Sequence, residues 1–148
     1  MGTGDDKEPL DVETVVERLN AALPLQLRSA VAYTIAAGSA TGFAYTPLGP
    51  QLWAFAQAEL EDARRLVEKV VALGGAPSTE VAEVVHHREG PETSAWLIEV
   101  ETEVVEKLQD VIPATGQTGP SEALEHRLEH LIMRKQEQID TLERARRG

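Results

Sequence analysis

Proline and glycine divide the 148-residue chain into four long segments, and apolar residues recur in each segment with helical spacing. The expected helices cover residues 11–37, with Asp11 as the N-cap, and residues 50–73, 91–112 and 120–146. Residues 78–85 suggest a further short helical piece, and very little of the chain alternates as a strand does. We therefore predict an all-α protein, an antiparallel four-helix bundle over residues 11–148 with a long crossover between the second and third helices. Residues 1–10 are expected to form a flexible N-terminal segment.

Charge and cysteine content restrict the partners of the chain. It has 14 Lys and Arg against 25 Asp and Glu, and this net charge of -11 disfavours nucleic acids and anionic membranes. It has no cysteine, so any metal must be held by oxygen or imidazole. Residues 1–10 lack the basic-then-apolar order of a secretory signal, and no apolar run approaches the roughly 20 residues of a membrane helix. We expect a cytoplasmic protein.

Polar residues interrupt the apolar stripe of every expected helix. At about 100° per residue, the inward-facing polar set is Gln26 on the first helix, Glu59 and Asp62 on the second, Glu101 on the third, and Lys135 and Gln138 on the fourth. Ionisable side chains are seldom buried unless they are paired or bind a metal. A bundle core that receives one ligand from each of two helices and an i, i+3 pair from each of the other two is the carboxylate-bridged di-iron arrangement. The spacing of this set reproduces that arrangement.

Three segments resemble the ferritin-like superfamily, and within it the chain most resembles bacterioferritin. The segments are LNAALPLQL, which begins at Leu19, ELEDARRLVEK, which begins at Glu59, and QIDTLE, which begins at Gln138. The resemblance implies that Glu59 is the bridging glutamate of the second helix. It also implies that Glu101 is the third-helix glutamate, with a register shift toward Glu99 or Glu103 left open.

The remaining ligand positions depart from the family. Gln26 and Lys135 stand where the family has glutamates, and Asp62 and Gln138 stand where its two Glu-x-x-His motifs have histidines. The resemblance therefore predicts that the usual di-iron site is absent. Leu60 occupies the position of the haem methionine of bacterioferritin, so no haem is expected. The chain continues only about ten residues beyond Gln138, without the fifth helix of ferritin cages, which favours a homodimer over a 24-subunit shell.

Three functions are compatible with this pattern. The first is a non-catalytic binding, accessory or structural protein, whose polar centre is a salt-bridge network built around Lys135. The second is a metalloprotein that acts in iron storage, iron oxidation or another oxidative reaction, with iron or another divalent cation held by Glu59, Asp62, Glu101 and Gln26 and with Tyr33 beside it. The third is an inactive subunit that co-assembles with a metal-competent ferritin-like chain. The first, non-enzymatic function is favoured, although three carboxylates and Lys135 sum to about -2 if all ionise as in water.

Two histidine pairs lie outside the inward-facing set. His126 and His130 have the i, i+4 spacing that can chelate a transition metal, but they project away from the stripe of Leu128 and Leu131. We predict that they form an exposed face without function. His86 and His87 lie in the crossover, and no site is predicted for them because adjacent residues of a helix do not converge on one metal.

Overall fold

Four α-helices make up the described part of the protein. The computed structural model describes residues 11–41, 45–85, 90–114 and 119–147. The helices are α1 (Val12–Ser39), α2 (Gly49–Ala72), α3 (Gly90–Val111) and α4 (Gly119–Arg147), with short 3-10 turns at Thr46–Leu48 and Ile112–Ala114. These ranges contain no strand, so the predicted all-α class is confirmed. The predicted flexible segment, residues 1–10, lies outside the described residues.

Local signals in the sequence set the helix ends. The Asp11 carboxylate caps α1 by accepting a hydrogen bond of 3.2 Å from the backbone N–H of Thr14. Pro50 occupies the first turn of α2, where its missing N–H is not needed. Gly74, at a φ of 84°, turns the chain out of α2 through the left-handed region. Because these signals are strong, the four helices begin and end within two residues of the expected positions.

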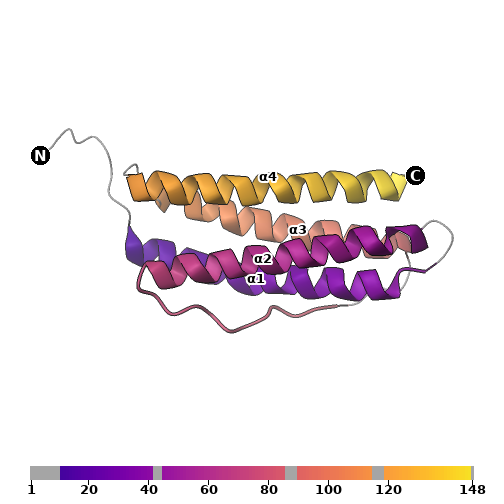
Figure 1. Ribbon diagram of the computed structural model, residues 1–148, viewed down its shortest axis with the longest axis horizontal. Coiled ribbons are helices and arrows are strands. Elements are labelled where there is room, and N and C mark those ends of the chain that lie inside the picture. Colours follow the sequence, from indigo (N-terminus) through magenta and orange to yellow (C-terminus); the bar gives the residue numbers. More distant parts are fainter. Residues whose placement is uncertain (1–10, 42–44, 86–89, 115–118, 148) are drawn as a thin grey trace, which may run out of the picture.

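Neighbouring helices run antiparallel, as Figure 1 shows, and α1 pairs with α2 while α3 pairs with α4. Residues 73–85 return along the bundle, so the predicted long crossover between α2 and α3 is confirmed. The predicted helical piece over residues 78–85 is wrong, because this segment forms no helix. Its N–H groups bond to α1 instead: that of Ser78 donates to Asn20 Oδ1 at 2.8 Å, and that of Ala82 donates to the Pro24 carbonyl at 3.1 Å.

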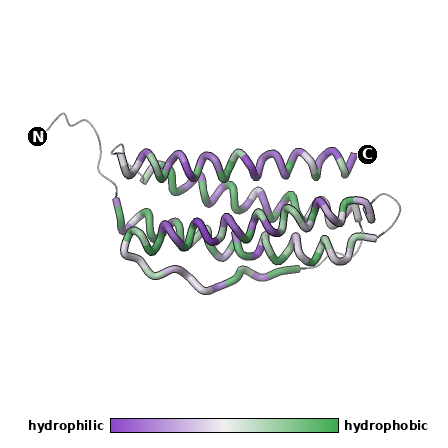
Figure 2. Tube along the Cα trace, in the orientation of Figure 1, coloured by the Kyte–Doolittle hydropathy of each residue, from purple (hydrophilic) through white to green (hydrophobic). Residues whose placement is uncertain are grey.

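A polar layer divides the apolar core into two clusters. One cluster draws on all four helices and includes Val15, Leu19, Leu23, Leu66, Val70, Val104, Leu108, Leu128 and Leu131. The second cluster lies further toward the other end of the bundle and includes Tyr33, Ala36, Leu52, Ala56, Trp96, Leu97, Val100 and Leu142. The six polar residues that the sequence predicts to face inward lie between the two clusters on their helices. Hydrophilic residues recur along the whole of α4 in Figure 2, and this helix supplies the cations of the polar layer.

Within residues 11–41, 45–85, 90–114 and 119–147, no helix is long and apolar enough to cross a membrane.

Candidate functional site

The polar layer contains all six side chains that the sequence predicts to face inward. They are Gln26 from α1, Glu59 and Asp62 from α2, Glu101 from α3, and Lys135 and Gln138 from α4, and each is at most 4% exposed. Each helix contributes them from its middle, between leucine, valine and alanine side chains that exclude water on both sides. Ionisable groups in such surroundings need partners.

Lys135 and Glu59 form the central ion pair. Both side chains are 0% exposed. Lys135 Nζ donates to Glu59 Oε1 at 2.8 Å and to Glu59 Oε2 at 2.7 Å, and it lies 3.4 Å from Asp62 Oδ2. The ammonium therefore uses its donors on carboxylates of α2 and joins α4 to this neighbouring helix.

Arg134 closes the centre from the seam between α2 and α4. These two helices pack loosely against each other, and a groove lined by Phe55, Arg134 and Gln138 runs along the seam. The Arg134 guanidinium reaches inward, and its Nη2 donates to Glu59 Oε2 at 2.7 Å and to Asp62 Oδ2. Its Nη1 donates to Gln138 Oε1. The side chain remains 26% exposed, so it separates the buried carboxylates from solvent.

Residues of α1 complete the surroundings of Glu59. The Ser29 hydroxyl donates to Glu59 Oε1 at 2.5 Å, and it also lies 2.7 Å from the Gln26 backbone carbonyl. Gln26 Nε2 donates to the Glu59 backbone carbonyl at 2.7 Å. Glu59 is thus bonded through both carboxylate oxygens and through its own main chain, which fixes its position more firmly than that of any other residue in the layer.

Glu101 lies at the other side of the layer, toward Tyr33. Gln138 Nε2 donates to Glu101 Oε2 at 3.0 Å and lies 3.4 Å from Glu59 Oε2, so its amide reaches both glutamates. Within the described residues, Glu101 Oε1 and the Tyr33 hydroxyl are buried and have no hydrogen-bond partner. The Tyr33 ring is held edge-on against Phe55, with ring centroids 5.6 Å apart.

The two glutamates differ in their preferred protonation states. Burial alone would raise the pKa of Glu59, but the Lys135 ammonium outweighs burial, and with hydrogen bonds to the carboxylate it lowers this pKa to about 2. Burial raises the pKa of Glu101 well above its ordinary value, and the negative charge of Glu59 raises it further. Burial likewise raises the pKa of Tyr33 well above 10. Glu59 is therefore ionised, and the environment of Glu101 favours its neutral acid form.

Two cations then face two carboxylates. Lys135 and Arg134 pair with Glu59 and Asp62, while Glu101 favours its uncharged form. The centre therefore balances its charge without any group from outside the chain. A balanced and hydrogen-bonded set of ions avoids most of the large free-energy cost of burying an unpaired charge.

The sequence located the layer but missed two of its members. Arg134 is absent from the predicted set because its backbone position lies at the edge of the stripe, and only its long side chain reaches the centre. Ser29 is one turn from Gln26 on α1, and this spacing is the signal that could have found it. The third-helix position is Glu101, which is buried, whereas the shifted alternatives Glu99 and Glu103 are exposed.

The described residues hold no group of three or more His, Asp or Glu side chains arranged to bind a metal ion. His126 and His130 are both exposed on α4, as predicted, and line a groove there with Glu122 and Arg127. His86 and His87 lie outside the described residues.

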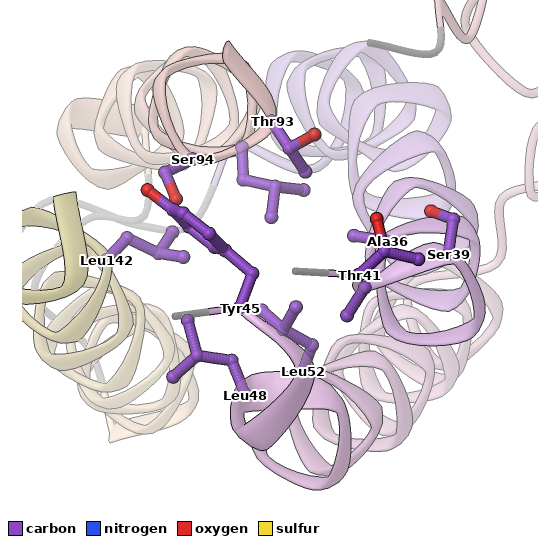
Figure 3. Close-up of a pocket in the computed structure, with 11 residues that line it drawn as sticks. Ala36, Ser39, Thr41, Tyr45, Leu48, Leu52, Thr93, Ser94 and Leu142 are labelled. Carbon is purple, nitrogen blue, oxygen red and sulfur yellow. The ribbon is translucent and has the colours of Figure 1, made fainter. Parts of the chain in front are cut away.

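A small pocket lies apart from the polar layer. It has a volume of about 20 Å³, room for about one water molecule, and lies at the end of the bundle where α3 begins. Figure 3 shows Tyr45 reaching across it toward Ser94 and Leu142, so the 3-10 turn before α2 closes this end of the core. The cavity is too small for an organic ligand, and the ionic centre remains the candidate functional site.

Comparisons with known proteins agree with the geometry. The family model described as Ferritin-like domain matches residues 16–147. A solved ferritin-like, diiron-carboxylate protein from Bacillus anthracis superposes with a TM-score of 0.85 at 23% identity, over 92% of this chain and 97% of that chain. A dodecameric thioferritin, the bacterioferritin-related protein from Bacteroides fragilis, gives a TM-score of 0.82 at 16% identity, over 92% of this chain and 86% of that chain. The search of curated proteins found no match.

Proposed function

The chain belongs to the ferritin-like domain family, and from this membership we propose that it is a ferritin-like protein with a degenerate di-iron centre that acts as a non-catalytic binding, accessory or structural protein. One observation carries the proposal. The fully buried Lys135 ammonium donates to both oxygens of Glu59, the residue that resembles the bridging glutamate of the family. A bridging ligand must offer those oxygens to metal ions.

The residues of the centre do not fit a pair of irons. Di-iron sites of this fold use carboxylates from all four helices together with two imidazoles. Here the described layer contains no imidazole, and the Asp62 carboxylate is bonded to Arg134. The cations Lys135 and Arg134 repel a divalent ion and already neutralise the carboxylates. We therefore assign the stabilising role of the metal to the two basic side chains of α4.

Metal analysis tests this assignment. The protein would be purified without chelators, its bound metals measured by elemental mass spectrometry, and the measurement repeated after anaerobic loading with Fe(II). We expect no stoichiometric iron before or after loading. One or two equivalents that are lost in the double variant Glu59→Ala/Glu101→Ala, but kept in the control Glu61→Ala/Glu103→Ala, would overturn the proposal. The control removes exposed glutamates from the same two helices. That result would favour iron storage, iron oxidation or another oxidative reaction.

A gain-of-function variant sharpens the test. Gln26→Glu, Asp62→His, Lys135→Glu and Gln138→His together place at these positions the residue types that the resemblance assigns to them. We expect this variant to take up Fe(II) under conditions in which the unmodified chain does not. If the variant folds, as judged by its helical circular dichroism, and still excludes iron after the further change Arg134→Ala, the residues replaced in this centre are not what removed the site.

We also propose that the chain forms a homodimer through one face of α1 and α2. Trp53 is 49% exposed and Leu60 is 59% exposed, and with Val31 they line an open apolar groove between these helices. Large apolar side chains gathered on one face favour burial against a partner. One solved relative is a dodecamer, so self-assembly through helix faces is compatible with the fold.

Light scattering after size exclusion tests the dimer. We expect a mass of two chains for the unmodified protein and of one chain for Leu60→Glu, with Val71→Glu as a control because Val71 is also an exposed apolar residue of α2. A monomeric unmodified chain would refute the homodimer. It would direct attention to co-assembly with a second ferritin-like chain.

A further inference from the structure

The exposed histidines of α4 form an unused pair of metal ligands. His126 and His130 lie one helical turn apart on the same face, and neither has a hydrogen bond or ion pair with another described residue. Side chains at i and i+4 of a helix are neighbours, with Cβ atoms about 5–6 Å apart, so two imidazoles at this spacing can bind one ion. Both are free to do so.

The helix holds this pair in a fixed position. Leu124, Leu128 and Leu131 interleave with the histidines and are buried in the apolar cluster on the opposite face of α4. Ion binding therefore does not need to order the backbone, which would otherwise weaken the affinity. Both imidazoles also open onto one groove, in which the small residues Gly119 and Ala123 leave space beside them.

Charge around the pair favours a cation. Residues 122–130 contain three glutamates, Glu122, Glu125 and Glu129, against the single arginine Arg127. Glu122 and Arg127 both line the groove of the two histidines, so the excess of carboxylates comes from Glu125 and Glu129 on the same stretch of helix. Together with the net charge of -11 for the whole chain, these carboxylates raise the local concentration of cations.

In place of the exposed face without function that the sequence predicts, we propose that His126 and His130 bind a divalent first-row transition-metal ion at the surface of α4. The two imidazoles supply two ligands, and water molecules fill the remaining positions of the ion. Imidazole is a suitable ligand for zinc, nickel and copper ions. Among divalent first-row metal ions, Cu(II) generally binds such a site most tightly. Mg(II) prefers oxygen ligands instead. The site shares no residue with the ionic centre, because both histidines are exposed whereas the six predicted residues of the centre are buried.

Titration of the full chain with Cu(II) and Zn(II), against a competing chelator, tests the proposal. We expect one Cu(II) per chain, nitrogen hyperfine splitting in its electron paramagnetic resonance spectrum, and weaker binding at acidic pH because an imidazole must lose its proton to ligate. His126→Ala and His130→Ala should each weaken binding at least about tenfold, since even partners outside the ligand set change metal affinity by that factor. Mg(II) should not compete.

The matched control is the double variant His86→Ala/His87→Ala, which removes the same number of imidazoles from the crossover. It should bind Cu(II) as the unmodified chain does. No binding by the unmodified chain would overturn the proposal, as would equal binding by His126→Ala/His130→Ala or an equal loss in the control. Because both histidines are exposed and alanine favours helix, the variants keep the fold, and circular dichroism verifies this.

Discussion

Removing the Lys135 ammonium is the most direct perturbation of the ionic centre. In the unmodified chain the Glu59 carboxylate accepts hydrogen bonds of 2.8 and 2.7 Å from Lys135 Nζ. Lys135→Met keeps an unbranched side chain of similar length but removes this donor. Breaking a fully buried ion pair in this way costs about 3–5 kcal/mol. Arg134 and Ser29 remain bonded to Glu59, so we expect the lower end of this range, about 3 kcal/mol. For a chain of this size the melting temperature should then fall by roughly 6–12 °C.

Urea unfolding followed by circular dichroism measures this loss, with thermal unfolding as a second readout. Lys107→Met is the matched control, because Lys107 is exposed on α3 and its replacement should change the free energy of unfolding by less than about 0.5 kcal/mol. The double variant Glu59→Gln/Lys135→Met removes both charges of the central pair. It should recover most of the loss, because a neutral pair no longer leaves an uncompensated ion in the core.

Two results would refute this reasoning. A loss below about 1 kcal/mol for Lys135→Met would mean that Glu59 does not depend on the ammonium, as surface pairs commonly do not. A double variant as unstable as the single variant would mean that Lys135 acts through packing of its methylene chain and not through its charge.

Further predictions concern protonation and the crossover. Relative to the unmodified chain, Glu101→Gln should become increasingly stabilising in urea unfolding as pH rises above 4.5, because the raised pKa of Glu101 makes the folded state hold a proton that the unfolded state releases. Because the pKa of Glu59 is lowered to about 2, its ionised carboxylate stabilises the folded state above pH 4.5, and this stabilisation is lost as pH falls toward 2. The free energy of unfolding of Glu59→Gln should therefore depend less on pH between 4.5 and 2. Asn20→Ala removes two hydrogen bonds, of 2.9 Å to the Ala76 carbonyl and 2.8 Å from the Ser78 N–H, and should cost about 1–2 kcal/mol in urea and expose residues 75–85 to protease.

The helices could be predicted because their signals are local. Asp11, Pro50 and Gly74 each act within one turn of the helix end that they define, so no knowledge of the tertiary structure is needed. The crossover could not be predicted in the same way. Residues 78–85 are paired through Asn20 and Pro24, which lie more than fifty residues earlier in the chain, and these distant partners replace the i, i+4 bonds of a helix.

Helical spacing alone predicted which backbone positions face the candidate site. Gln26, Glu59, Glu101 and Lys135 interrupt apolar stripes whose positions follow from periodicity alone, and all four are buried. Periodicity describes where a side chain leaves the backbone, but it does not describe how far that side chain reaches. Arg134 lies at the edge of its stripe, and only the loose seam between α2 and α4 lets its guanidinium enter the centre.

The omission of Arg134 changes the electrostatic argument. Counted without it, and with every carboxylate ionised, the centre has an excess of negative charge that invites a metal ion. With Arg134 counted, and with burial favouring the neutral form of Glu101, two cations balance two carboxylates. A divalent ion that entered this centre would therefore have to displace Lys135 and Arg134 together, and both are consecutive residues of one helix. If only Lys135 or only Arg134 moved away, the other would stay bonded to Glu59 and Asp62, and the ion would meet that cation at close range. Under our proposal of a degenerate centre, these two adjacent basic residues therefore oppose iron in addition to the missing ligands.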